Sequence, residues 1–147
     1  MMRHQMYLMS SGFSRTSLIW PMRSRTVGFS CACFLLPAVA GNINVVFRAY
    51  WVLQAAVAFL SDYLWSGVSH WSHGADRWLS LAMVSATVAL GTSRLGCAII
   101  PCAAVPLYCL FRSKSALFWA EYEMWHTLWH VTGGIISAAV LSIKTSA

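Results

Sequence analysis

Two histidines stand four residues apart in the segment EMWHTLWH, residues 123–130. Residues three and four apart share one face of a helix, so Glu123, His126 and His130 are expected to form a single stripe. Two imidazoles at this spacing can bind one metal ion, as they do on the helix of many zinc proteases. Catalytic zinc takes a third protein ligand and keeps its fourth position for water. The motif therefore predicts a zinc site if the rest of the chain supplies that ligand.

The third ligand is expected from the polar segment SHWSHGAD, residues 69–76. Either His73 or His70 can supply a nitrogen, and acidic residues nearby can orient a ligand or act as a general base. We therefore predict as metal ligands His73, His126 and His130, and as catalytic residues Asp76, Asp62 and Ser61.

The same histidines have other possible uses. They can form hydrogen bonds with Glu123, Asp76 or lipid headgroups at a membrane interface and bind no metal. Facing histidines on two helices can also bind haem iron, but the sequence shows no second well-placed intramembrane histidine. Asp62 follows a long apolar run, so it needs a partner such as His73 or His130.

The composition indicates a membrane protein. Hydrophobic residues make up 59% of the chain and charged residues 10%, and the mean hydropathy is +0.62. A soluble domain has about 45–50% apolar and about 25% charged residues. The net charge of +6 does not come from a compact basic run with interleaved aromatics, so we exclude nucleic acid as a partner. Arginines instead stand at the edges of apolar blocks, where they hold helix ends at the headgroup level.

The apolar blocks from residue 45 to residue 147 predict an all-α fold, a polytopic transmembrane helical bundle of about four spans. The predicted spans are residues 45–65, 78–93, 95–111 and 116–143. Pro101 and Pro106 are expected to kink the third span. A small-residue face that includes Gly133 and Gly134 is expected to allow close packing of the fourth span. Gln54, inside the first span, is expected to serve packing more than hydrogen bonding.

Residues 1–44 form a separate basic segment in this interpretation. The stretch VGFSCACFLLPAVA, residues 27–40, is shorter than the ~20 residues of a span. It has the length of a signal-peptide core and ends in the small-residue pattern Ala38-Val39-Ala40 that signal peptidase favours. We predict a signal or re-entrant segment here.

The four-span arrangement fixes which charges share a side of the membrane. One side would hold Arg3, Arg15, Arg23, Arg25, Arg48, Arg94 and Lys144, and the other Arg77, Arg112 and Lys114. The excess of basic residues favours a cytoplasmic location for both termini. The same arrangement gathers all the acidic residues at one end of the bundle: Asp62, Asp76, Glu121 and Glu123.

The order of these elements resembles a known superfamily of seven-span membrane hydrolases. It includes the alkaline ceramidases, lipid-remodelling proteins of GPI anchors, and adiponectin-receptor-like proteins. The resemblance lies in a helix end with Ser61 and Asp62, a histidine and Asp76 before the next helix, and the late pattern His-x-x-Trp-His that contains His126 and His130. It covers residues 54–80 and 121–135.

The resemblance implies a zinc ion that activates water against a lipid amide or ester, held by a serine, an aspartate and three histidines. His126 and His130 match the late pair, and Asp76 matches the family aspartate. The family serine precedes a histidine by four residues, whereas Trp65 stands four residues after Ser61. The chain also has about four spans where the family has seven.

Two function classes other than a hydrolase fit the same residues. A non-enzymatic membrane protein could use the polar cluster to hold its helices together, and a small transporter subunit could use it as a proton relay. In each case we expect a multi-pass protein in contact with membrane lipid. A bundle of so few spans also leaves room for a homo-oligomer.

Overall fold

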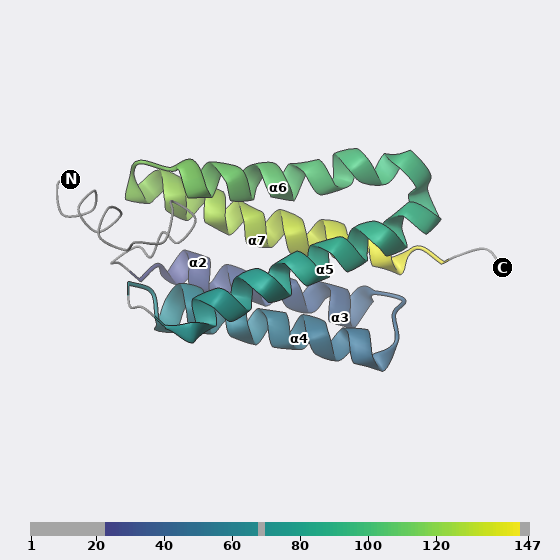
Figure 1. The fold of residues 1–147 in the computed structure, drawn as a ribbon, viewed down its shortest axis with the longest axis horizontal. Coiled ribbons are helices and arrows are strands. Elements are labelled where there is room, and N and C mark those ends of the chain that lie inside the picture. Colours follow the sequence, from purple (N-terminus) through teal and green to yellow (C-terminus); the bar gives the residue numbers. More distant parts are fainter. Residues whose placement is uncertain (1–22, 68–69, 145–147) are drawn as a thin grey trace.

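The computed structural model describes residues 23–67 and 70–144. These residues form helices and no strand. The helices lie side by side along one long axis, as Figure 1 shows. The prediction of an all-α fold is confirmed for the described part of the chain.

The first described elements are α2 (Arg25–Ser30), the 3-10 helix η1 (Cys31–Leu35) and α3 (Leu36–Ala40). Together they form one continuous element, here called the N-terminal rod. At its start Ser24 donates a hydrogen bond to Glu123, and at its end Ser142 donates one to the carbonyl of Ala40 at 2.9 Å. The rod therefore runs along α7 (Trp119–Ser142) for most of its length.

The 3-10 turns lengthen the N-terminal rod, which helps it extend along most of α7. The helix between Glu123 and Ser142 is about 28 Å long at 1.5 Å per residue. Residues in a 3-10 helix rise about 2.0 Å each, so η1 lengthens the rod beyond what an α-helix of the same residues would span. The sequence had placed residues 1–44 apart from the bundle, whereas the structure packs residues 25–40 within it.

Helix α4 (Val45–Phe59) continues into a π-helical turn, η2 (Leu60–Leu64). The side chain of Asn44 caps α4 by accepting the Phe47 N–H at 2.9 Å. Next, α5 (Trp71–Leu95) begins where the His70 imidazole accepts the Ser72 N–H at 3.3 Å. The helix therefore begins before the predicted span, which starts at residue 78, because the polar segment before that span is already helical and capped by a histidine.

The chain reverses at η3 (Gly96–Ala98), where Gly96 has a φ of +57°. Only glycine adopts this conformation freely. Helix α6 (Ile99–Ser115) then returns beside α5 and continues through Pro106. Two stretches, Val45–Leu64 and Trp71–Ser115, are long and apolar enough to cross a membrane. The second consists of α5, η3 and α6, which double back on one another (Figure 1).

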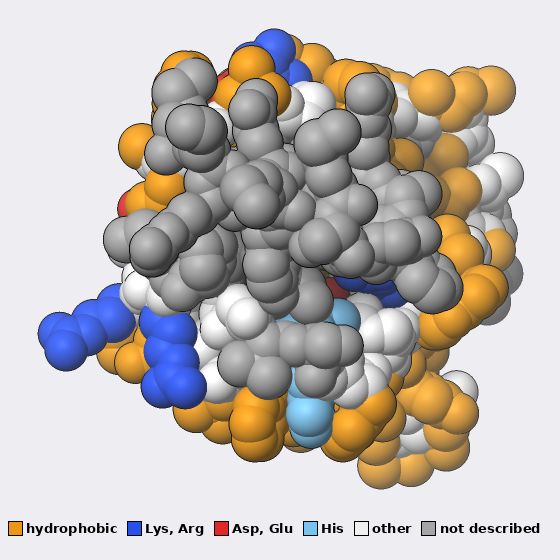
Figure 2. Space-filling model, turned by 60° about the vertical axis from the view of Figure 1, so that its left-hand side comes forward, with side chains coloured by type: hydrophobic (Ala, Val, Ile, Leu, Met, Phe, Trp, Pro, Cys, Tyr) orange, Lys and Arg blue, Asp and Glu red, His pale blue; other side chains and the backbone are white. Residues whose placement is uncertain are grey.

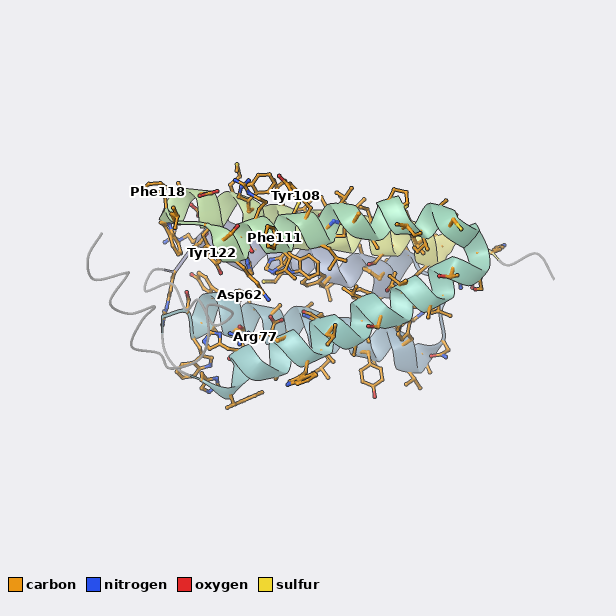
Figure 3. All side chains as sticks on the ribbon, turned by 45° about the horizontal axis from the view of Figure 1, so that its top comes forward. Asp62, Arg77, Tyr108, Phe111, Phe118 and Tyr122 are labelled. Atoms are coloured by element: carbon orange, nitrogen blue, oxygen red, sulfur yellow. The ribbon has the colours of Figure 1, made fainter. Side chains whose placement is uncertain are left out.

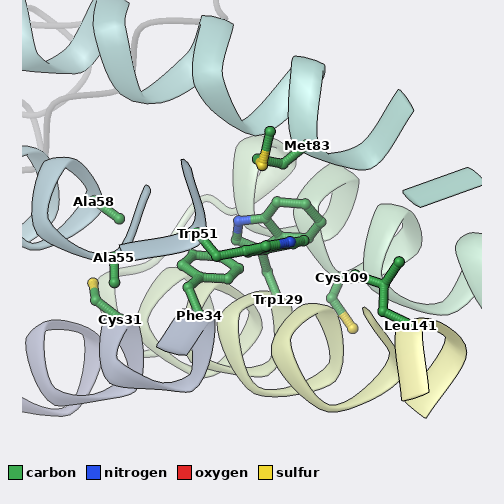
Figure 4. Packing of buried hydrophobic residues seen from close by; sticks show 9 residues of the cluster. All are labelled: Cys31, Phe34, Trp51, Ala55, Ala58, Met83, Cys109, Trp129 and Leu141. Atoms are coloured by element: carbon green, nitrogen blue, oxygen red, sulfur yellow. The ribbon is translucent and has the colours of Figure 1, made fainter. Parts of the chain in front are cut away.

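Aromatic rings fill the middle of the bundle. Figure 4 shows Trp51 and Trp129 close together with Phe34 beside them and Met83 above. The Phe34 ring lies 6.2 Å from each indole. Gly134 allows the rod to approach α7, since a Cβ there would lie 2.3 Å from the Cys33 carbonyl oxygen. The predicted small-residue face of α7 is confirmed, and it packs against the N-terminal rod.

Candidate functional site

Asp62 is the centre of the polar cluster. Its Oδ2 lies 3.1 Å from Nε2 of His126 and 3.3 Å from Nε2 of His130. The side chains of Asp62 and His130 are 10% and 1% exposed. The helical spacing of the histidines brings both rings to one carboxylate, and the π-helical turn of η2 presents that carboxylate to them. Such turns occur frequently at functional sites.

The other ring nitrogen of each histidine faces a serine. Ser30 Oγ lies 2.8 Å from Nδ1 of His130, and Ser113 Oγ lies 3.4 Å from Nδ1 of His126. Each hydroxyl also donates to a carbonyl of its own helix, that of Val27 at 2.7 Å and that of Leu110 at 2.8 Å. A hydroxyl has one proton to donate, so each serine accepts from its histidine.

These hydrogen bonds leave the second ring nitrogen of each histidine facing the same carboxylate oxygen. A neutral histidine that donates from Nδ1 has an unprotonated Nε2. Both Nε2 atoms then face Asp62 Oδ2, which is itself an acceptor. An acceptor oxygen at 3.1 and 3.3 Å from two unprotonated nitrogens needs a cation between them, either protons or a metal ion. Histidine ligands of metals usually donate their second N–H to a neighbouring group in this way.

His73 reaches the cluster through a serine. Its Nδ1 lies 2.8 Å from Ser61 Oγ, and Ser61 Oγ lies 3.2 Å from Asp62 Oδ1. The predicted ligand trio of His73, His126 and His130 is thus not assembled directly, and Asp62 stands in the place expected of His73. Between the two alternatives of the sequence, His73 faces the cluster, whereas His70 caps α5 and stacks on Trp65 at 4.4 Å.

Asp76 has a partner that the sequence did not indicate. The amide of Gln54 donates to Asp76 Oδ1 at 2.8 Å and to Ser80 Oγ at 2.8 Å. Gln54 is 1% exposed. Packing was the favoured use of Gln54, but the structure shows hydrogen bonds by which it joins α4 to α5. Asp76 makes no described contact with the histidine pair.

A cavity of about 310 Å³ opens beside the cluster. Its wall includes Asp62, His73, Asp76 and His126, with the apolar side chains of α5 and α6. Figure 3 shows Asp62 and Arg77 at the same end of the bundle as Tyr122. Tyr122 also lines the cavity and stacks on His126 at 4.9 Å. The predicted catalytic carboxylates therefore share one cavity, although they have different partners.

The N-terminal rod contributes residues that the sequence did not single out. Besides Ser30, Cys31 approaches His130, with Sγ 3.6 Å from Nδ1. Ligand atoms of Cys31, Asp62 and His130 all lie within 4.8 Å of one another. Residues 27–40 have the pattern of a signal peptide, which gives no sign that these side chains reach the histidines of α7.

The remaining acidic residues lie at the same end but outside the cluster. Glu121 forms an ion pair with Arg112 at 2.9 Å, and Glu123 accepts from Ser24. The prediction that the acidic residues gather at one end is confirmed. The expected pairing of Glu123 with the histidines is replaced by its bond to the rod.

No family model, curated protein or solved structure matches this chain. The arrangement of its own side chains is therefore the basis for a function.

Proposed function

We propose that this chain is a multi-pass membrane protein that hydrolyses a lipid amide or ester with a zinc ion held at Asp62, His126 and His130. One observation carries the proposal: two imidazole Nε2 atoms face the same carboxylate oxygen, at 3.1 and 3.3 Å, and Asp62 and His126 line a cavity. Nitrogen and oxygen donors of this kind form the three-ligand sites of catalytic zinc.

The distribution of polar and apolar side chains supports membrane insertion. Within the two stretches that could cross a membrane, only 33% and 17% of the apolar windows are buried. Large side chains such as Trp78, Ile100 and Phe111 are exposed, and Figure 2 shows apolar groups along the edges of the visible face. Gln54, Thr87 and other polar residues are buried instead. An apolar exterior around a polar interior suits a bundle in lipid.

The residues around the ligands can do the rest of the chemistry. Bound zinc would polarise a carbonyl and lower the pKa of a water ligand. Ser30 and Ser113 hold the two histidines in the tautomer that a ligand needs. Ser61 connects Asp62 to His73, which faces the cavity and can exchange a proton with a bound substrate.

Metal content of the detergent-purified protein tests this proposal. We expect close to one zinc per chain by elemental mass spectrometry, lost in the His126→Ala, His130→Ala double variant. His70→Ala is the matched control, since this histidine caps α5 away from Asp62 and should leave the zinc in place. Folded wild-type protein without zinc would contradict the proposal.

The second candidate is a structural cluster without metal. It is favoured by the same bonds, because protonated His126 and His130 would satisfy Asp62 fully. In that case the double variant would unfold more easily, and no metal would be present in wild-type protein. A proton-linked transport role, which uses the same groups, would add a flux that depends on pH.

A further inference from the structure

Two cations from different helices line the cavity. Arg77 belongs to the first turns of α5 and Lys114 to the last turn of α6. Both line the 310 Å³ cavity that also contains Asp62 and His126. Figure 3 shows Arg77 at the cluster end of the bundle. The cavity that contains the proposed reaction site therefore also has two positive side chains in its lining.

These cations lack the partners that other basic residues have. Arg112, on the same helix as Lys114, pairs with Glu121 and does not line the cavity. Among the described residues, no carboxylate lies within ion-pair distance of Arg77 or Lys114. Both interact at longer range with Asp76, which offsets part of their charge.

The cavity combines this polar lining, which also contains the carboxylates of Asp62 and Asp76, with apolar side chains. Its wall continues with Leu81, Val84, Leu107 and Leu110. A second, smaller cavity of about 40 Å³ shares Val84 and two further residues with it and lies deeper among α5, α6 and α7. Small-molecule sites have volumes of about 300–1,000 Å³, with a few polar groups in an apolar lining. An amphiphile with an anionic head matches this distribution.

We propose that the cavity binds a single-chain lipid with a phosphate monoester headgroup, held by Arg77 and Lys114 with its chain toward Val84 and Trp129. A phosphate monoester carries a charge of about −1.5 to −2 at pH 7, which suits two cations. Arginine and lysine are the usual binders of phosphate oxygens. This inference names the substrate class of the site. It rests on the proposed function, because a bound lipid is a substrate only if the site is catalytic.

Binding measured on the full chain in a neutral maltoside detergent tests the proposal. The probes are a lysophosphatidic acid, a monoacylglycerol of the same chain length, and inorganic phosphate. Tryptophan fluorescence provides the signal, since Trp129 lines the cavity. We expect the phosphate lipid to bind at least about tenfold more tightly than the neutral lipid, a difference of about 1.4 kcal/mol.

Single substitutions test which residues produce the preference for the phosphate lipid. Arg77→Gln and Lys114→Gln should each reduce the preference for the phosphate lipid about tenfold, whereas Arg112→Gln should leave it unchanged. Equal affinity for both lipids, or an equal loss in Arg112→Gln, would overturn the proposal. Inorganic phosphate that displaces the lipid at equal concentration would also overturn it, because the site would then take free phosphate.

The zinc proposal and the headgroup proposal can be refuted independently of each other. The same titrations are made with EDTA and in the His126→Ala, His130→Ala variant. A preference that persists there supports the headgroup site even when no zinc is found. A zinc-containing protein with no preference refutes the headgroup site and leaves the hydrolase proposal intact.

Discussion

The two ends of the bundle use their polar residues in different ways. At one end, Asp62 and Asp76 bind side chains from other helices, and both face a cavity. At the other end, Arg48 and Arg94 bind backbone carbonyls. Arg48 donates to the carbonyls of Ala38 at 2.6 Å and Gly41 at 2.9 Å, near the end of α3.

Arg94 does the same for α7. It donates to the carbonyls of Val140 at 3.2 Å and Leu141 at 2.7 Å, and the Asn42 N–H donates to the Leu141 carbonyl at 2.7 Å. The last carbonyls of a helix lack partners within the helix and carry partial negative charge. The arginine end therefore supplies hydrogen-bond donors to carbonyls near the ends of α3 and α7. The carboxylate end instead gathers charged side chains around a cavity.

Removal of Asp62 should have the largest effect. In Asp62→Ala, His126 and the buried His130 lose the carboxylate that both rings face, and we expect a loss of about 3–5 kcal/mol of stability together with loss of metal. Thermal unfolding in detergent and metal content measure the two effects. Glu121→Gln is the control, because an exposed ion pair is worth no more than about 1 kcal/mol. A stable, metal-containing Asp62→Ala protein would remove Asp62 from the site.

Loss of an arginine at the other end should lower the stability of the protein without changing its zinc content. Arg94→Ala removes the guanidinium donor from the carbonyls of Val140, Leu141 and Asn42. Hydrogen bonds to charged groups contribute about 1.5–3 kcal/mol, so the free energy of unfolding should fall by about 2 kcal/mol with zinc content unchanged. Arg23→Ala, which changes an exposed arginine, should change neither quantity. Metal loss in Arg94→Ala would show that the two ends are coupled.

A smaller effect is expected at Ser30. In Ser30→Ala, His130 Nδ1 loses its hydroxyl partner, while the fold keeps its packing. Outer partners of metal ligands typically contribute about 10–100-fold in affinity, so zinc affinity should fall about tenfold with little change in unfolding temperature. Ser115→Ala is the control, because Ser115 is exposed and binds only carbonyls of its own helix. Unchanged zinc affinity would show that the N-terminal rod does not support the site.

Apolar length predicted part of this fold well. The first and fourth predicted spans, 45–65 and 116–143, nearly coincide with Val45–Leu64 and with α7. The start of α5 could not be predicted, because its cap is a histidine and histidine is not among the preferred caps. The rod was missed because a segment that contains 3-10 turns covers more length than its residue count suggests.

Several residues of the cluster were named from the sequence, but the pairs that they form were not. The spacing of His126 and His130 fixed their common face, and the position of Asp62 after an apolar run required a partner for it. Which histidine would meet Asp62, and which residue would hold Asp76, depended on how the helices rotate against one another. Sequence periodicity gives the face of each helix, but side-chain packing decides the angle between faces.

The last prediction concerns which end faces the cytoplasm. Since the rod runs the length of the bundle, Arg23 and Arg25 lie at the carboxylate end, with Arg77, Arg112 and Lys114. Arg48, Arg94 and Lys144 lie at the other end. The grouping made from four spans was wrong for Arg23 and Arg25, because it placed them with Lys144.

If the bundle crosses the membrane, the excess of basic residues at the carboxylate end places that end in the cytoplasm and Lys144 on the opposite side. An epitope tag after residue 147 should therefore react with antibody only when the far side of the membrane is opened. The control is a cytoplasmic marker that reacts under selective permeabilisation. A tag that is accessible from the cytoplasm would reverse the orientation and place the cavity on the far side. The contacts within each end would be the same, so this test bears on where the substrate comes from and leaves the site itself unchanged.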